Sequence, residues 1–470
     1  MKRNSDTQLK EPVHKMKSTP KDIITFEKGW EIIENVLNWM KTMALENFKT
    51  KNPRFTPEQY MSVYNTVHDM CSQRTPFNGA SKIYTEQCRY TVAYLVDNIL
   101  PILQKHRGIP QLQKIMESWR SYKILVKWFR KFFLYIDRYH VVQLGKPTVE
   151  ESAKRAFREH IFDNIFENAT ESIIEILNEY RCGKLFDEDF WKQLVAFYAE
   201  MSEVHINSRI DTMFRTLIHP IQVNSKKFYA CESAKRVDDI CSYLLWVEKM
   251  IECDKKCFKY FEPYYVYRHG PKYIANSYVS MLCPYIKPIL DTVQNLFATS
   301  AWSSITRIYK LFCDLEKIYA SKNFTIINPA SDFFIEAPVI LQKQITEKGT
   351  AVVESRKEDV DKRGKDSLKN YDFIKNILCL HAEMRKNVEK HCNDTRFFQA
   401  VDLAFTEFFN VNVCEFTTAQ LLASYCDSLL KVDEEPFSED VAAVIHIFRC
   451  IYFFEVTKQL VDTSNATPCR

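Results

Sequence analysis

Apolar residues recur along this 470-residue chain at steps of three and four positions, which is the period of one face of an α-helix. The pattern is sustained longest from Leu112 to Tyr139, where it predicts one long helix facing a core. The apolar positions of this helix are Leu112, Ile115, Met116, Trp119, Tyr122, Leu125, Val126, Phe129, Phe132, Phe133, Ile136 and Tyr139. Its other flank is basic and carries Lys123, Lys127, Arg130, Lys131 and Arg138.

Two Thr-Pro pairs mark predicted helix starts near the N-terminus. Thr56 is placed to cap a helix that has Pro57 at its first position and Gln59 at its third, which is the capping-box arrangement. This helix is expected to stop before Thr75-Pro76. Thr19-Pro20 predicts a similar start after a flexible basic tail over 1–19. The apolar stripe that follows it is Trp30, Ile33, Leu37 and Met40.

Helical spacing continues over most of the remaining chain. A stretch over 152–180 is expected to end at Gly183, because glycine suits a left-handed C-terminal cap. Residues 345–368 are dense in charged side chains and are expected to form a solvated, mobile connection. No convincing alternating strand pattern is found, so the fold is predicted to be all-α, and successive long helices favour an elongated α-solenoid. Other predicted helices occupy about 81–100, 187–204, 236–262, 273–297, 300–320, 369–390, 396–410, 417–431 and 438–459.

The composition argues against nucleotide binding and catalysis. The chain has only 8 glycines, where an ordinary usage of about 7% would give roughly 33. Few glycines leave little room for phosphate-binding loops, and the closest two, Gly349 and Gly364, are too far apart for either common glycine-rich motif. No catalytic or zinc-binding motif is found among the 15 cysteines and their neighbours. We therefore expect a non-catalytic protein without cofactor or metal.

Two weaker chemical candidates have simpler explanations. Asp187-Glu188-Asp189 offers paired carboxylates, but carboxylates also suit the start of a helix, where they complement the helix dipole. His381, His391 and Cys392 offer metal ligands. Their spacing on one helix sets the two histidines apart in angle, so surface histidines are the preferred interpretation.

The charge balance is close to neutral, with a net charge of +4. This balance does not indicate nucleic-acid binding. The basic flank of the long helix is then either a solvated face or a docking face for an acidic protein. No apolar run predicts a signal peptide or a membrane span, and reduced cysteines are expected, so the predicted localisation is cytoplasmic and/or nuclear.

Several motifs, in order and spacing from about 25 to 455, resemble the cullin family, most closely the plant members of its SCF class. The stretch that begins Glu27-Lys28-Gly29-Trp30 resembles the first helix of those chains, and Ser424–Lys431 is similar to the motif that closes the cullin N-terminal domain. The other similar segments are Glu58–Tyr64, Met70–Gln73, Lys123–Trp128 and Phe132–Tyr139. The middle of the chain follows the family only loosely.

The resemblance implies three five-helix cullin repeats. The expected boundaries place repeat one at 20–150, repeat two at 151–295 and repeat three at 296–412. The start of the cullin C-terminal region would then occupy 413–460, followed by a divergent tail over 461–470.

In SCF-class cullins, helices two and five of the first repeat hold a Skp-type adaptor, which carries an F-box substrate receptor. The resemblance therefore implies a scaffold that takes part in ubiquitin-dependent protein catabolism. For Tyr60 and Tyr64, packing within the repeat is the alternative role. The adaptor-binding positions that the resemblance implies are Tyr60, Met61, Val63, Tyr64, Lys123, Lys127, Arg130, Arg138 and Tyr139.

The sequence given ends at Arg470, whereas complete cullins continue into a domain that recruits a RING-box subunit and accepts a ubiquitin-like modifier. On this basis no RING-box subunit is expected, and a decoy that occupies an adaptor without delivering ubiquitin is one interpretation. A degenerate cullin paralogue that binds nothing and an unrelated helical scaffold are the alternatives.

Overall fold

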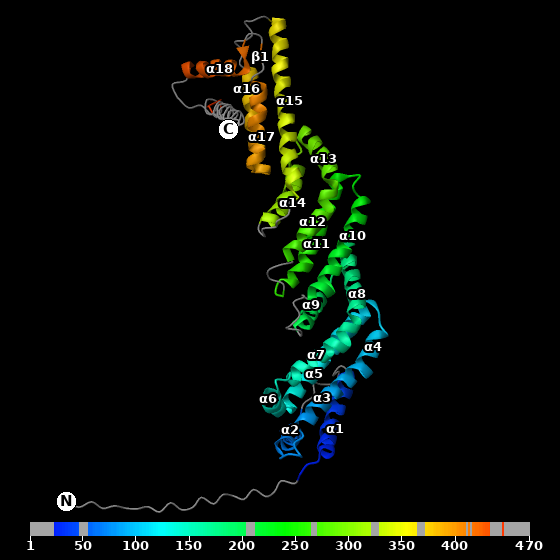
Figure 1. Cartoon of the computed structure of the whole chain (residues 1–470). Helices are drawn as coiled ribbons and strands as arrows, with labels where there is room; N and C mark the ends of the chain where they lie inside the picture. Colours follow the sequence, from blue (N-terminus) through cyan, green and yellow to red (C-terminus); the bar gives the residue numbers. More distant parts are fainter. Residues whose placement is uncertain are drawn as a thin grey trace, which may run out of the picture. The chain divides into compact units, whose positions relative to one another are not determined.

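The computed structural model is built almost entirely from helices, which confirms the predicted all-α solenoid class (Figure 1). The chain falls into two compact units, Met1–Ile221 and Gln222–Arg470. The predicted boundaries of the three repeats stay a prediction. The residues that the structure describes are 23–46, 55–203, 212–264, 270–320, 329–363, 372–409, 412–413, 416–432 and 444–445.

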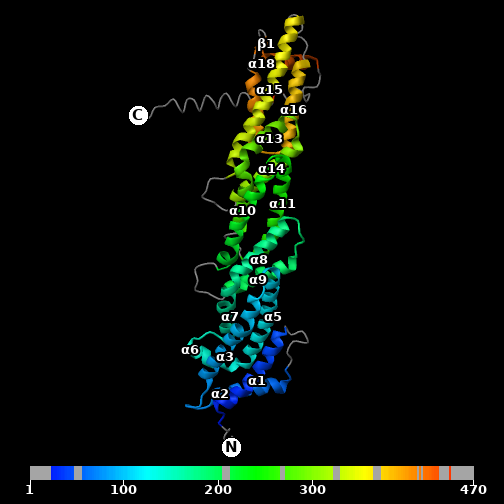
Figure 2. The same cartoon turned by 90° about the vertical axis from the view of Figure 1, so that its right-hand side faces the viewer.

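The first unit is a stack of helices around α5, which contacts α1, α2, α4, α7, α8 and α9. Figure 2 shows α5 beside α7 and α3 in this unit. Its helices are α1 (Phe26–Leu45), α2 (Pro57–Ser72), α3 (Ala80–Tyr94), α4 (Leu100–Gln104), α5 (Gly108–Phe132), α6 (Val142–Leu144), α7 (Val149–Phe157), α8 (Asp163–Arg181) and α9 (Glu188–Glu203). Wider π-helical turns occupy Leu95–Ile99, Ile136–Val141, Arg158–Phe162 and Phe214–Ile218.

Capping signals predicted several helix ends correctly. The backbone N–H of Gln59 donates to Thr56 Oγ1 at 3.2 Å, and Gln59 Oε1 accepts from the N–H of Thr56 at 3.0 Å, so the predicted capping box of α2 is confirmed. Gly183, at φ +94°, ends α8 as expected. There the N–H of Lys184 donates to the carbonyl of Glu179 at 3.0 Å, the long bond of a Schellman cap.

Two predicted helix boundaries differ in the structure. Thr25, not Thr19, caps α1, and Thr19-Pro20 lies outside the described residues. The helix predicted from Leu112 to Tyr139 is interrupted at Phe133, where ψ changes to 18° and α5 ends. The chain then resumes as the π-helical turn Ile136–Val141.

The second unit contains most of α10 and all later elements. The buried side chains of these helices form one hydrophobic core. Figure 1 shows α15 and α17 side by side, and these two helices make extensive contact. The elements are α10 (His219–Ala234), α11 (Ile240–Phe258), α12 (Gly270–Leu282), α13 (Ile286–Ala298), α14 (Trp302–Ala320), α15 (Ser331–Arg363), α16 (Asp372–His391), α17 (Thr395–Phe409), β1 (Asn412–Val413), β2 (Phe416–Thr417) and α18 (Thr418–Val432). Short 3₁₀ turns occupy Lys259–Phe261 and Cys283–Tyr285.

The predicted connection over 345–368 is wrong for its first part, because α15 runs through it as far as Arg363. Ile345 and Val353 are buried, and Gly349 between them packs on Phe408 of α17. One small or apolar position per turn seats this helix, Glu347, Glu354 and Glu358 are exposed, and Arg356 is buried. The remainder of the segment, 364–371, lies outside the described residues.

Some elements of the second unit have no counterpart in the sequence prediction, and one predicted helix lies mostly outside the described residues. The sequence pattern did not predict α10, the first turns of α15, or the antiparallel pair β1–β2, in which Val413 faces Phe416. Of the helix predicted over 438–459, only Val444 and Ile445 lie within the described residues, and both are helical.

The chemical candidates from the sequence have structural roles. Asp187 caps α9, accepting the backbone N–H of Phe190 at 2.9 Å, so the helix-start interpretation is correct. His381 is buried edge-on against Phe405, which corrects its expected surface position, and His391 hydrogen-bonds Thr306. Within the described ranges, no group of acidic, His and Cys side chains could hold a metal, and no helix is long and apolar enough to cross a membrane.

Candidate protein-docking surfaces

All the predicted adaptor-binding residues except Val63 lie on one of two different surfaces of the first unit. We call the first the aromatic patch; it consists of side chains from α2 and from the chain just after α5. Its members are Tyr60, Met61, Tyr64, His68, Tyr135, Arg138 and Tyr139. We call the second the α5 groove; it lies between α5, α7 and α9 and contains Lys123, Lys127 and Arg130.

Ring contacts give the aromatic patch a firm base. Tyr60 stacks on Tyr64 and on Phe132, each with ring centroids 6.1 Å apart. At the other end of α2, His68 meets Tyr135 edge-on at 4.8 Å, and Tyr135 contacts Tyr139 at 4.6 Å. Tyr60 and Tyr64 are therefore half-buried, and both packing and docking roles remain open to them.

Two large side chains of the patch are exposed to solvent. Met61 is 42% exposed and Tyr139 is 53% exposed, although both are large and apolar in character. Val63, by contrast, is 2% exposed and packs in the core, and the docking role implied for it stays a prediction.

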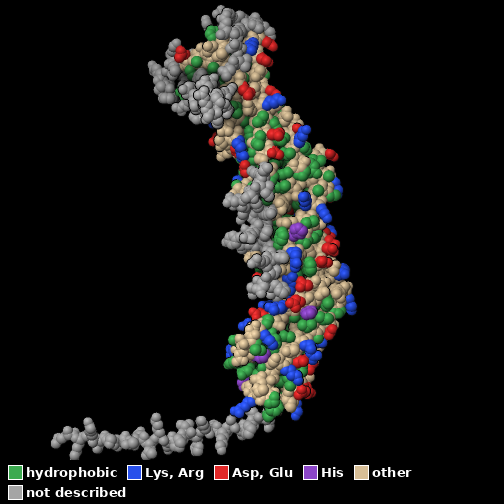
Figure 3. Space-filling model, in the orientation of Figure 1, with side chains coloured by type: hydrophobic (Ala, Val, Ile, Leu, Met, Phe, Trp, Pro, Cys, Tyr) green, Lys and Arg blue, Asp and Glu red, His purple; other side chains and the backbone are tan. Residues whose placement is uncertain are grey.

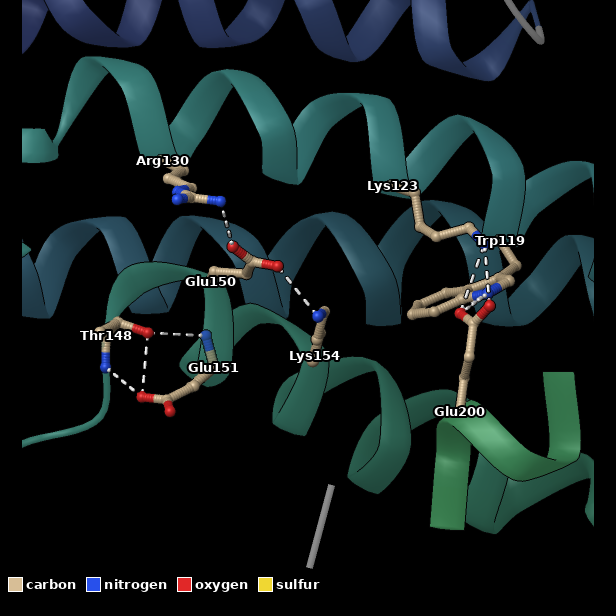
Figure 4. Close-up of polar contacts among 8 residues, drawn as sticks. All are labelled: Trp119, Lys123, Arg130, Thr148, Glu150, Glu151, Lys154 and Glu200. Atoms are coloured by element: carbon tan, nitrogen blue, oxygen red, sulfur yellow. Dashed lines mark hydrogen bonds and ion pairs between the residues drawn. The ribbon is translucent and has the colours of Figure 1, made fainter. Parts of the chain in front are cut away.

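The α5 groove is a mixed-charge cleft of about 670 Å³. Figure 4 shows Lys123 and Arg130 reaching from α5 toward carboxylates on α9 and α7. Lys123 Nζ lies 3.2 Å from Glu200, whose second oxygen accepts the indole N–H of Trp119 at 2.9 Å. The groove is lined by Trp119, Lys123, Val126, Lys127, Arg130, Glu150, Glu151, Lys154, Arg155, Glu200, Met201 and Glu203.

One carboxylate of the groove bridges two cations. Glu150 accepts from Arg130 at 3.4 Å and pairs with Lys154 at 2.9 Å (Figure 4). Its neighbour Glu151 instead closes the capping box of α7, accepting the N–H and the hydroxyl of Thr148 at 2.8 and 2.9 Å. These hydrogen bonds from Thr148 lower the pKa of Glu151 and keep it ionised.

The two surfaces lie on opposite sides of α5. Nine residues separate Lys123 from Phe132, and at roughly 100° per residue this places them about 180° apart around the helix. Phe132 supports Tyr60, whereas Lys123 faces the groove. The structure therefore does not join the groove cations Lys123, Lys127 and Arg130 and the α2 aromatic side chains into one continuous patch.

Sequence reasoning missed several residues of both surfaces. His68 carries a signal that could have found it, because it lies one helical turn after Tyr64 on the same face of α2. Glu150 and Glu200 carry no such signal, since their pairing with α5 depends on how distant helices pack.

Comparison with known proteins agrees with this architecture. The family model "Cullin alpha solenoid domain" matches residues 42–453. The chain is 24% identical over 422 residues to Cullin-2 of Arabidopsis thaliana, covering 86% of this chain and 53% of that protein. It is 22% identical over 444 residues to Cullin-1 of Oryza sativa subsp. japonica, covering 91% of this chain and 57% of that protein. It also matches Putative cullin-like protein 1 of Arabidopsis thaliana, at 22% identity over 87% of this chain and 54% of the relative.

The chain thus spans a little over half the length of each of these relatives. The family model covers most of the chain and both compact units, from within α1 to beyond α18. On the strength of that match, this chain belongs to the cullin family.

Proposed function

We propose that this chain is a non-catalytic scaffold component of a ubiquitin ligase, and that its aromatic patch binds a Skp-type adaptor and, through it, F-box proteins. Membership of the cullin family supports the scaffold role. The observation that carries the adaptor role is the pair of large exposed side chains, Met61 and Tyr139, on a base of packed aromatic rings.

Such an arrangement has the properties of an interface hot spot. Tyrosine and methionine are enriched at interface cores, and a rigid backing means that little side-chain freedom is lost on binding. Arg138, exposed beside Tyr139, adds a charge that can steer an acidic partner. Tyr60 and Tyr64 contribute by fixing α2 against α5, and their exposed edges extend the surface.

The test is calorimetric binding of the chain to a plant Skp-type adaptor, first with a double variant that leaves the stacked rings of Tyr60, Tyr64 and Phe132 in place. Met61→Glu combined with Tyr139→Ala alters only exposed side chains, so the fold is retained. We expect this double variant to weaken binding by at least about tenfold. Tyr60→Ala/Tyr64→Ala is expected to weaken it too, but through loss of packing as well as of contact area.

A matched control makes the same chemical changes elsewhere. Leu185 and Tyr264 are both exposed and lie outside the patch, so Leu185→Glu/Tyr264→Ala should bind like the parent. If the folded parent does not bind the adaptor, or if both double variants weaken binding equally, the adaptor proposal is wrong. Family membership would be unaffected by either outcome.

A further inference from the structure

We propose that the α5 groove is a second protein-docking site of this chain, which binds an acidic peptide segment of a partner protein. The site is separate from the aromatic patch and does not depend on adaptor binding.

The groove has the size and floor of a ligand site. Its volume of about 670 Å³ falls in the range of roughly 300–1,000 Å³ typical of ligand pockets. Trp119, Val126 and Met201 form its floor, where little or none of each side chain is exposed, and the aliphatic stems of the flanking lysines extend this floor with accessible apolar surface. An apolar side chain of a bound peptide would therefore find a firm contact between the flanking charges.

The cations of the groove are only partly neutralised. Five basic side chains line it, Lys123, Lys127, Arg130, Lys154 and Arg155, against four carboxylates. Glu150 and Glu200 are held by ion pairs, and Glu151 is engaged in the cap of α7. Within the described part of the chain, no ion pair or side-chain hydrogen bond is found for Lys127 or Arg155, and both are exposed.

Carboxylates are the ligands that this groove already holds. Glu150 sits between Arg130 and Lys154, and Glu200 sits between Lys123 and the indole N–H of Trp119. These internal contacts show that carboxylates fit among the basic side chains of this groove, and Lys127 and Arg155 offer an incoming Asp or Glu donors of the same kind. Charge-assisted bonds of this kind are stronger than neutral ones, more so beside an apolar floor.

A nucleic acid fits the groove less well than an acidic peptide. A phosphate backbone is a dense row of negative charges, and the rim carboxylates Glu150, Glu200 and Glu203 would repel it. A peptide can instead place its acidic residues beside the unpaired cations and an apolar residue on the floor. Over the face drawn in Figure 3, the basic and acidic side chains of the described residues are interspersed.

The test uses the whole chain and a short fluorescent peptide in which glutamates flank a central leucine. Two control peptides have the same sequence with glutamine or with lysine in place of each glutamate. We expect anisotropy to detect binding of the glutamate peptide only, and binding to weaken as salt is raised. The Lys127→Glu/Arg155→Glu variant should lower the affinity by at least about tenfold.

Two further variants separate this site from a general charge effect. Lys226→Glu/Lys227→Glu makes the same change in net charge on exposed residues of the second unit and should bind the peptide like the parent. Glu150→Gln removes an internal carboxylate competitor, so it should raise the affinity several-fold (roughly threefold or more). A purely structural ion-pair cluster would not gain affinity from that change.

Adaptor binding provides the remaining readout. The cullin resemblance implies an adaptor contact for Lys127 but not for Arg155, so Arg155→Glu alone is used here, and the proposal predicts that it leaves adaptor binding unchanged. The proposal is overturned if the glutamate and glutamine peptides bind alike, or if neither binds. It is also overturned if the second-unit control weakens binding as much as the groove variant does.

Discussion

Gly349 of α15 lies directly against the ring of Phe408 on α17, so close that a Cβ on Gly349 would overlap three carbons of that ring. The contact lies within the most extensive helix pair of the second unit. Because Gly349 is inside a helix, its replacement by alanine would ordinarily be stabilising. The two effects oppose each other, and their magnitudes decide the outcome.

Gly349→Ala is expected to destabilise the second unit. Overpacking a filled core typically costs about 1–3 kcal/mol, which exceeds the gain of up to about 1 kcal/mol in helix propensity. The measurement is the urea midpoint of unfolding, followed by circular dichroism. In a Phe408→Leu background the ring is gone, so the same alanine should then be neutral or stabilising. A stable single variant would contradict the close packing of α15 on α17.

Gly29 makes a matched comparison in the first unit. A Cβ there would meet the thioether of Met70 rather than an aromatic ring. Methionine has three rotatable bonds and can move aside, so Gly29→Ala should be milder than Gly349→Ala, within about 1 kcal/mol of the parent. An equal loss for both variants would show that the flexibility of the neighbour does not matter.

The buried carboxylate of Asp254 depends on hydroxyl donors. Tyr229 and Ser277 both donate to its Oδ2, at 2.7 and 2.6 Å, and Asp254 is fully buried. Tyr229→Phe should therefore lower the free energy of unfolding by about 1–3 kcal/mol. Tyr90→Phe is the control, because the partner of its hydroxyl, Asn38, lies in an exposed contact. That control should change stability by less than about 1 kcal/mol.

The cap of α7 should contribute measurably to the first unit. Thr148→Ala removes the acceptor of the Glu151 N–H and should cost about 1 kcal/mol. Glu151→Gln keeps an acceptor for the N–H of Thr148, so it should be nearly neutral. Thermal unfolding of the two variants side by side would test this difference, and a larger loss for Glu151→Gln would contradict it.

Asp394 gives the second unit a pH dependence. Burial raises the pKa of this carboxyl, but hydrogen bonds from Arg396 outweigh burial, and the net shift is downward. A lowered native pKa contributes stability above the unfolded value and loses it as the pH falls through the native value. Arg396→Gln should therefore cost about 1–2 kcal/mol near neutral pH, after allowing for the partial exposure of Arg396.

The difference between parent and Arg396→Gln should shrink below about pH 4, because Asp394 is then protonated in the unfolded chain and increasingly in the native one. Urea midpoints measured across the acid range would follow this convergence. A constant difference at every pH would mean that Asp394 does not account for it, and that the contacts of Arg396 with Glu316 and Phe334 dominate instead.

Local signals predicted the fold well where a few neighbouring residues decide the structure. The capping box from Thr56 to Gln59 and the glycine cap at Gly183 act over one helical turn, so both could be recognised from the sequence. The segment from Ile345 to Arg363 was mistaken for a connection because its helix is held by α17, about 60 residues further along the chain. The many charged residues of this segment gave no indication of the positions at which α15 packs on α17.

The candidate site was predicted less completely for the same physical reason. The sequence placed Tyr60, Val63 and Tyr64 on one helix, but only packing decides that Val63 faces the core. It also showed a basic flank on α5, but the partner of Lys123 lies 77 residues away on α9. Which side of α5 that flank faces, relative to α2, is a tertiary property.

Glu150 bridges Arg130 and Lys154 and is also tethered to the groove that it occupies. A tethered group competes at an effective concentration on the order of millimolar or more. A free acetate or chloride ion, which makes one contact, has little power to displace it. A ligand that engages several cations and the apolar floor together can do so. The number of simultaneous contacts that a ligand makes therefore decides whether it binds in the α5 groove. The tethered carboxylate of Glu150 is the competitor that those contacts must displace.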